Sequence, residues 1–263
     1  MLVLNANTYL GNVVDTNQAD GFCIGRVRYN QDGYFDDMHC HQNPHFSLVV
    51  SGGNIEKRKT VSFERLPGSV TFYHAGEAHQ NIYQVAGSSH INIEIASSWL
   101  QHYSLDLDTV NRQHFSHPDT AMLMLRMYKE SLTADNFSAD SMKLLLLELL
   151  SYSKEKVLHK PSWINILEQI LNDSWNETPT LQHLSHVAGV HPITISKHFS
   201  KYFGCTFGEY MRKQKVAKAI VLMNKSDITL TALAYECGFA DQSHFIRIFK
   251  QLTGLLPREY QRL

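Results

Sequence analysis

The first hundred residues alternate short apolar runs with turn residues, a pattern typical of β-strands. The runs are rich in Val, Ile, Phe and Tyr, and glycine-bearing turns such as Ser51–Gly53 and Pro67–Gly68 separate them. Strands are expected at Gly21–Tyr29, Phe46–Val50, Ile55–Phe63, Val70–Tyr73, Gln80–Val85 and Ile91–Ile95, with a further turn at residues 31–33. Several short strands at spacings of about 8–12 residues predict an antiparallel β-barrel or sandwich.

After Ser97 the apolar positions change to helical spacing. Helices are expected over Pro118–Leu132 and Ser138–Leu158, each with an aspartate close to its start. The second carries one apolar stripe, formed by Met142, Leu145, Leu146, Leu149 and Leu150. The stripe is wide enough to pack on a second copy of the chain or on the protein's own barrel, and we expect a homodimer.

From Trp163 onward the whole sequence pattern is helical, and Lys160 and Pro161 are taken as the boundary between two parts of the chain. The pattern predicts an α+β protein of two domains: a barrel over residues 1–105, and an all-helical domain over residues 161–263. Residues 106–160 form a helical linker between them. Residues 1–160 carry 13 basic and 17 acidic side chains, net −4, whereas residues 161–263 carry 11 and 8, net +3. The charge difference is a weak indication that the second half faces nucleic acid.

The helical domain contains an internal repeat. Leu181–Val190 matches Leu230–Phe239 at an offset of 49 residues, with Gly189 aligned to Gly238. Each copy predicts an amphipathic helix that ends at a glycine and a second helix that begins at once, because glycine adopts the left-handed turn conformation without a steric penalty. A plain helical bundle explains one copy equally well but two copies poorly. The repeat therefore predicts two helix-turn-helix units.

Composition narrows the protein class further. The chain is 43% hydrophobic and 19% charged, which excludes a disordered or low-complexity protein. Its longest apolar run, Leu144–Leu150, is too short to cross a bilayer, so no membrane partner is expected. The first residues lack the basic region of a secretory signal, and the four cysteines are scattered. These features predict a cytoplasmic protein.

The second copy of the repeat carries a family resemblance. Residues 234–260 contain Gly-Phe, Gln-Ser-x-Phe and Arg-x-Phe-Lys followed by Gly, Pro and Tyr in register, and the first copy fits more loosely at Ser196–Phe199 and Phe207–Met211. This region resembles the DNA-binding domain of AraC/XylS-type bacterial transcription regulators. The resemblance implies two helix-turn-helix units on adjacent major-groove segments of promoter DNA, a contact with RNA polymerase if the protein is an activator, and no enzymatic activity.

The resemblance also implies which positions contact DNA. Base contacts are expected from exposed positions of both second helices, namely Ile193, Ser196, Lys197, Gln242, Ser243, His244 and Arg247. Arg247 suits guanine and Gln242 suits adenine, because each can form two hydrogen bonds to that base. Phosphate contacts are expected from Lys201, Lys213, Lys250 and Arg258. The alternative for each residue is a solvated helix face.

Histidines gather in the first part of the chain, where residues 1–160 hold 10 of the 15. His39 and His41 point the same way in a strand, and His79 follows a glycine turn. This arrangement resembles the cupin barrel, whose metal-binding members use two His, a Glu and a later His. Here His45 or Phe46 occupies the expected place of the Glu.

Two interpretations of the histidines stay open. They either line a pocket without an ion, or hold Zn, Ni or Fe through His39, His41 and His79, with His45 as a further candidate. Strand alternation places a small-molecule effector near Arg26, His41, Tyr73, His79 and Glu94. The function expected is therefore a ligand-sensing transcription regulator, and the alternative is a metal-dependent cupin enzyme with an appended helical domain.

Overall fold

The protein is described from a computed structural model. The structure describes residues 1–30, 36–83, 87–105, 107, 118–133, 135–151, 160–173, 179–224 and 228–263. It consists of two compact units, one formed by Met1–Glu155 with Thr253–Leu263 and the other by Lys156–Leu252. The turn expected at residues 31–33, the strand end at 84–85 and the helix end at 152–158 lie outside the described residues.

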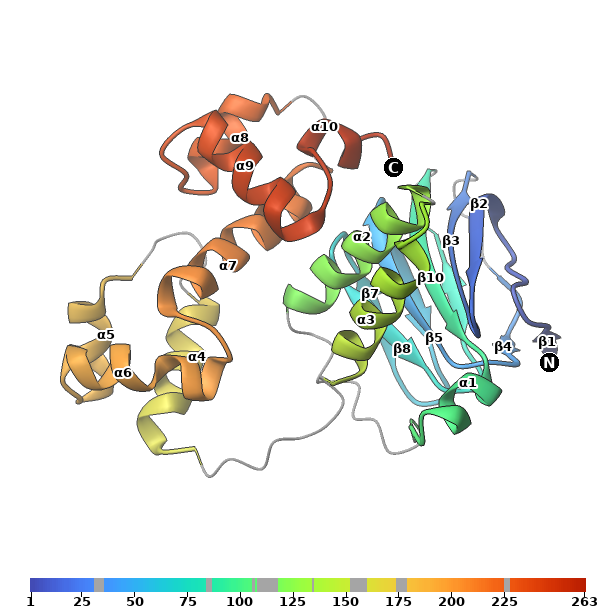
Figure 1. The fold of residues 1–263 in the computed structure, drawn as a ribbon, viewed down its shortest axis with the longest axis horizontal. Coiled ribbons are helices and arrows are strands. Elements are labelled where there is room, and N and C mark those ends of the chain that lie inside the picture. Colours follow the sequence, from blue (N-terminus) through green and yellow to red (C-terminus); the bar gives the residue numbers. More distant parts are fainter. Residues whose placement is uncertain are drawn as a thin grey trace. The chain divides into compact units, whose positions relative to one another are not determined.

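Ten described strands build the first unit (Figure 1). They are β1 (Leu2–Leu4), β2 (Asn12–Ala19), β3 (Phe22–Tyr29), β4 (His39–His41), β5 (His45–Ser51), β6 (Asn54–Lys57), β7 (Ser62–Arg65), β8 (Val70–Tyr73), β9 (Gln80–Ile82) and β10 (Ser88–Ile95). The expected strand at 55–63 is interrupted: β6 and β7 form a hairpin, with Asn54 opposite Arg65 and Lys57 opposite Ser62.

The strands pair into three sheets. Five form an antiparallel sheet in the order β2-β3-β10-β5-β8, three form the sheet β7-β6-β9, and β1 pairs with β4 in parallel. A bridge between His39 and His79 links β4 to β9. The prediction of antiparallel strands is confirmed, but the prediction of a closed barrel is wrong. A barrel closes only when the two edge strands pair, and β2 and β8 each have one neighbour in the described sheet.

Helices α1 (Ser97–His102), α2 (Pro118–Thr133), α3 (Ser138–Ser151) and α10 (Pro257–Tyr260) also belong to this unit. Helix α3 packs on α2, and four members of its apolar stripe are buried there: Met142, Leu146, Leu149 and Leu150. Leu144, beside the stripe, is 68% exposed. Packing on α2 already removes the apolar surface of the stripe from water. The stripe expected to bind a second chain is therefore covered within the unit.

The last eleven residues pack within the first unit. The hydroxyl of Tyr260 donates a hydrogen bond of 2.7 Å to the carbonyl of Val50 on β5. The main-chain oxygen of Leu263 accepts hydrogen bonds from Arg28 (3.1 Å) and from Ser89 (2.9 Å). These contacts attach the end of the chain to β3, β5 and β10.

Six helices form the second unit: α4 (Ser162–Asp173), α5 (Leu181–Ala188), α6 (Pro192–Phe203), α7 (Phe207–Leu222), α8 (Leu230–Glu236) and α9 (Gln242–Thr253), whose final residue belongs to the first unit. Leu167 and Leu171 of α4 pack with Leu184, Ile195 and Phe199 in one apolar core. Among the described residues, no helix combines the length and apolarity that crossing a bilayer requires.

Candidate functional sites: two helix pairs and a histidine-lined recess

The first helix pair is α5 and α6. Helix α5 ends at Gly189, whose φ of +66° is the left-handed conformation expected of this glycine. Helix α6 follows with Pro192 in its first turn, where a missing N–H costs no hydrogen bond. Ile195 and Phe199 are fully buried, whereas Ile193, Ser196 and Lys197 are exposed. The predicted base-contacting residues of the first copy thus share the solvent face of α6.

The second pair, α8 and α9, repeats this arrangement. Gly238 has a φ of +73°, and the carboxylate of Asp241 caps α9 by accepting a hydrogen bond of 2.7 Å from the backbone N–H of His244. Ser243 and Arg247 are exposed, whereas Gln242 and His244 are half-buried. The hydroxyl of Thr231 on α8 donates a hydrogen bond of 2.6 Å to the side chain of Gln242.

Helix α7 joins the two pairs and braces the second one. The ammonium groups of Lys215 and Lys218 donate hydrogen bonds to the carbonyls of Gly238 (2.5 Å) and Glu236 (2.6 Å) at the end of α8. These carbonyls are among those that a helix leaves unpaired at its C-terminus, so the two lysines stabilise the turn. Sequence reasoning did not assign this role. The alignment of the repeat offered no signal for it, because both lysines lie between the copies.

The residues predicted to contact phosphate lie at the surface. Lys201, Lys250 and Arg258 are exposed, and Lys213 is half-buried on α7. The ammonium of Lys201 also lies 5.2 Å from the centre of the Tyr202 ring. Three exposed cations of the four therefore satisfy the geometric condition for a phosphate contact, and the role itself stays a prediction.

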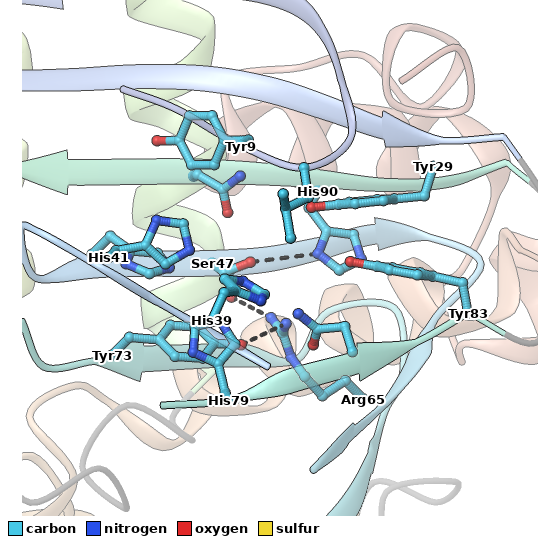
Figure 2. Close-up of a pocket in the computed structure, with 14 residues that line it drawn as sticks. Tyr9, Tyr29, His39, His41, Ser47, Arg65, Tyr73, His79, Tyr83 and His90 are labelled. Carbon is cyan, nitrogen blue, oxygen red and sulfur yellow. Dashed lines mark hydrogen bonds between the residues drawn. The ribbon is translucent and has the colours of Figure 1, made fainter. Parts of the chain in front are cut away.

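The first unit contains a polar recess between its sheets (Figure 2). Five histidines line it, His39, His41, His45, His79 and His90, together with Ser47, Arg65, Tyr73, Asn81 and Asn92. The free space among these side chains is about 20 Å³. That volume is about what one water molecule needs, so in this conformation the recess accommodates a water or a single ion.

Two residues predicted for the recess lie elsewhere. Arg26 pairs with Asp15 at 3.4 Å and donates to the main-chain oxygen of Leu263, on the face of β3 opposite Val27 and Tyr29. Glu94 is buried, but its carboxylate accepts hydrogen bonds from the backbone of Asn7 (3.0 Å) and the side chain of Asn43 (2.8 Å). His41, Tyr73 and His79 line the recess as expected.

A buried ionic network supports one side of the recess. Arg65 is 2% exposed and donates hydrogen bonds to the carbonyl of Ser47 (2.8 Å) and to the hydroxyl of Tyr73 (3.1 Å). That hydroxyl in turn donates a hydrogen bond of 2.6 Å to the fully buried carboxylate of Glu56. Burial raises the pKa of Tyr73 well above its usual value, which keeps the phenol protonated as a donor. The sequence signal that was missed is the alternation of polar residues within otherwise apolar strands, as at His45 and Ser47.

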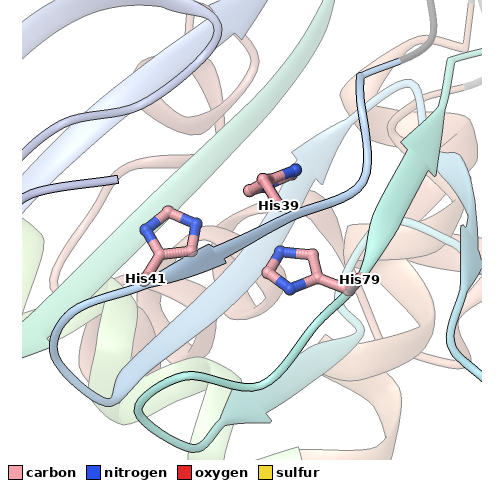
Figure 3. A group of neighbouring side chains, drawn as sticks. All are labelled: His39, His41 and His79. Atoms are coloured by element: carbon pink, nitrogen blue, oxygen red, sulfur yellow. The ribbon is translucent and has the colours of Figure 1, made fainter. Parts of the chain in front are cut away.

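His39, His41 and His79 form a compact group (Figure 3). One ring nitrogen of each lies within 4.8 Å of the others, and all three side chains are buried. Burial and the neighbouring His39 lower the pKa of His41 to about 4 and that of His79 to about 2. Both rings are therefore neutral at pH 7, so each has a nitrogen lone pair that can bind a metal.

His90 lies at another part of the recess. Its ring nitrogens lie 3.0 Å from the hydroxyl of Ser88 and 3.5 Å from that of Ser47. Burial first, and then the charge of Arg65, lower its pKa well below the usual value. This residue was not predicted, although it alternates with Asn92 and Glu94 along β10.

Known proteins match the chain over different lengths. Residues 184–263 match the helix-turn-helix domain family. YpdC, an uncharacterized HTH-type transcriptional regulator of Escherichia coli K12, is 30% identical over 90 residues, 34% of this chain and 32% of YpdC. The HTH-type transcriptional activator RhaS of Escherichia fergusonii is 24% identical over 166 residues, 61% of this chain and 57% of RhaS.

Among solved structures, ToxT from Vibrio cholerae O395 superposes with a TM-score of 0.38 at 15% identity, over 94% of this chain and 96% of ToxT. The chain spans less than two thirds of the length of the two curated relatives, YpdC and RhaS. The match to the domain family covers α6 and α9 and the glycine turns before them. By this match and by its sequence relatives, the last third of the chain is similar to the helix-turn-helix domains of transcriptional regulators.

Proposed function

We propose that this protein is a transcription regulator that reads a promoter sequence through α6 and α9 and senses a small molecule or ion in its first unit. The observation that carries the proposal is the shared design of the two helix pairs. Each has a left-handed glycine turn, an apolar face in the core and an exposed polar face on its second helix. Such a second helix can place its side chains against base edges in a major groove.

Two such helices require a suitable separation. Helix α7 has 16 residues, which at 1.5 Å per residue gives a length of about 24 Å. A rigid joining helix of this length, extended by the side chains at its ends, can hold α6 and α9 against two DNA segments that lie about one duplex turn, or ~34 Å, apart. The bracing of α8 by Lys215 and Lys218 favours a fixed orientation of the second pair on α7.

The side chains on the two faces are suited to different contacts. Arg247 is exposed and can form two hydrogen bonds to guanine, while Ile193, 68% exposed, suits the methyl group of thymine. Gln242 can pair with adenine only after its side chain leaves the hydroxyl of Thr231. We therefore expect Arg247 to contribute more discrimination between bases than Gln242.

The alternative of a metal-dependent enzyme is not favoured. It is supported only by the histidine group, whereas the sequence relatives are named transcriptional regulators. The proposal is made for a single chain, because the stripe on α3 expected to bind a second copy is buried on α2. A dimer would need another face, and sedimentation of the protein with and without DNA tests it.

The test is selection of binding sites from a pool of random duplexes at modest salt. We expect an enriched site with two protected segments about 10 base pairs apart. Lys197→Ala on α6 and Arg247→Ala on α9 should each relax the preference in a different segment. His186→Ala, at an exposed position of α5, is the matched control and should leave both segments unchanged. A pool without enriched sites, or two variants that act on the same segment, would disprove the proposal.

A further inference from the structure

Three histidines of the recess satisfy several conditions for a metal site. His39 and His41 lie on β4 with their side chains on the same side of the strand, and the bridge between His39 and His79 brings β9 next to it. The rings of His39 and His79 are 4.3 Å apart between centres, and those of His39 and His41 are 5.3 Å apart. Residues far apart in the sequence therefore bring three imidazoles to one place.

The hydrogen bonds of the rings fix which nitrogen is free. Nδ1 of His39 lies 2.8 Å from the carbonyl oxygen of Asp37, and Nδ1 of His79 lies 3.1 Å from that of Glu77. A carbonyl only accepts hydrogen bonds, so each Nδ1 carries a proton, and Nε2 is the nitrogen of each ring that can bind a metal. Metal-ligating histidines are held in this way, with the second ring nitrogen donating to a carbonyl or carboxylate.

His41 supplies the remaining evidence. Its Nδ1 is buried and has no hydrogen-bond partner among the residues that the structure describes. An unpartnered buried ring nitrogen loses the free energy of a hydrogen bond to water, unless an ion or a water molecule occupies the site. The recess has space for one such particle, about 20 Å³.

We propose that His39, His41 and His79 bind a divalent transition-metal ion, with Zn²⁺ as the ion that the ligand set fits best. All three ligands are imidazole nitrogens, which suit Zn, Cu, Ni and Fe and not the oxygen-preferring Mg²⁺ or Ca²⁺. Two nitrogens bound to one tetrahedral zinc at 2.0–2.1 Å are about 3.4 Å apart. The three ring nitrogens lie within 4.8 Å of one another, so binding must draw them together by up to about 1.4 Å.

Three protein ligands leave the fourth position of a tetrahedral zinc for water or a small molecule. His45 lies next to this group, with its ring centre 4.2 Å from that of His41, but it is not within the shared ligand distance. The proposal does not depend on DNA binding, so the failure of one leaves the other standing.

The test measures Zn²⁺ binding to the full chain by competition with a chromophoric chelator, together with the metal content after dialysis. We expect one ion per chain. Mutating a residue that only hydrogen-bonds to a metal ligand typically lowers metal affinity by about 10–100-fold. The loss of a ligand itself, in His79→Gln or His41→Gln, should therefore weaken Zn²⁺ binding by at least about 10-fold. His102→Gln, an exposed position of the same unit, should bind as the wild type does.

A spectroscopic measurement on the wild type tests the proposal even if the variants fail to fold. The Co²⁺-loaded wild type should show the visible absorption of a tetrahedral site without a thiolate charge-transfer band, because Cys40 is not in the group. Zinc should also raise the melting temperature of the wild type but not that of His79→Gln. A thiolate band, equal affinities in wild type, His41→Gln and His79→Gln, or no bound ion at all would overturn the proposal.

Discussion

The recess of the first unit and the exposed faces of α6 and α9 present polar side chains in opposite ways. In the recess the polar groups are buried, and several of them hydrogen-bond to one another, as with Arg65, Tyr73 and Glu56. On α6 and α9 they face water, and the apolar residues on the opposite face form the core. Substitutions in the recess should therefore change stability first, whereas substitutions on the helix faces should change binding and leave stability as it is.

The largest effect is expected from Glu56→Ala. The variant leaves the buried guanidinium of Arg65 without its carboxylate, and removing one partner of a buried ion pair typically costs about 3–5 kcal/mol. Urea denaturation followed by circular dichroism measures this loss. Glu64→Ala, at an exposed position of the neighbouring strand β7, is the control and should change the free energy of unfolding by less than about 0.5 kcal/mol. Equal losses in the two variants would contradict the structural role of the network.

Gly238→Val comes next and acts on the helix pairs through the backbone. Valine at a φ of +73° costs roughly 1–3 kcal/mol, which should unfold the turn between α8 and α9 and abolish specific DNA binding. Gly208→Ala in α7 is the contrasting change, because Gly208 has no positive φ and alanine is the better helix former by about 1 kcal/mol. Thermal unfolding should move in opposite directions for the two variants, and a shift in the same direction would contradict this account.

The helix pairs were predictable from sequence because their signals are local. Gly189 and Gly238 mark left-handed turns, and the apolar spacing of Ile195 and Phe199 identifies the buried face of α6. The exposed face then follows by exclusion. The capping of α8 by Lys215 did not follow, because it depends on how α7 crosses α8.

The recess was only partly predictable. The His-x-His pattern at His39 and the later His79 showed where histidines gather, but not that Arg65 would face them. Strand alternation gives two possible faces for every residue, and the choice depends on pairing with distant strands. Arg26 was assigned to the wrong face for this reason. Closure of the barrel failed as a prediction for the same reason, since edge strands are defined by pairing rather than by composition.

Arg247→Ala tests the helix face without affecting the core. We expect a loss of about 1–3 kcal/mol for the selected DNA site and a relaxed preference at one base pair, with no change in the melting temperature. Binding is measured by titration of the selected duplex and of a duplex with that base pair changed. If the variant discriminates between the two duplexes as well as the wild type, Arg247 does not read a base.

His90 makes the stability of the folded protein depend on pH. Its pKa in the folded protein lies well below the value of about 6.5 that the unfolded chain has, because the ring is buried near Arg65. The unfolded chain therefore binds a proton first as the pH falls, and the folded state loses stability below about pH 6.5, by roughly 1 kcal/mol per pH unit. Denaturation at pH 7.5 and 5.5 should show a smaller difference for His90→Gln than for the wild type. An unchanged difference would show that His90 does not contribute.

The smallest effect is expected from Lys250→Ala on the last turn of α9. Lys250 is exposed, and a contact with a phosphate attracts every DNA sequence alike. Its removal should weaken binding to the selected site and to random duplexes by the same factor, and reduce the slope of log affinity against log salt by about 1. Lys57→Ala, an exposed lysine of β6 in the first unit, is the control and should leave the slope unchanged. A base-specific loss with an unchanged slope would instead place Lys250 among the residues that read sequence, and the division of α9 into reading and anchoring residues would have to be redrawn.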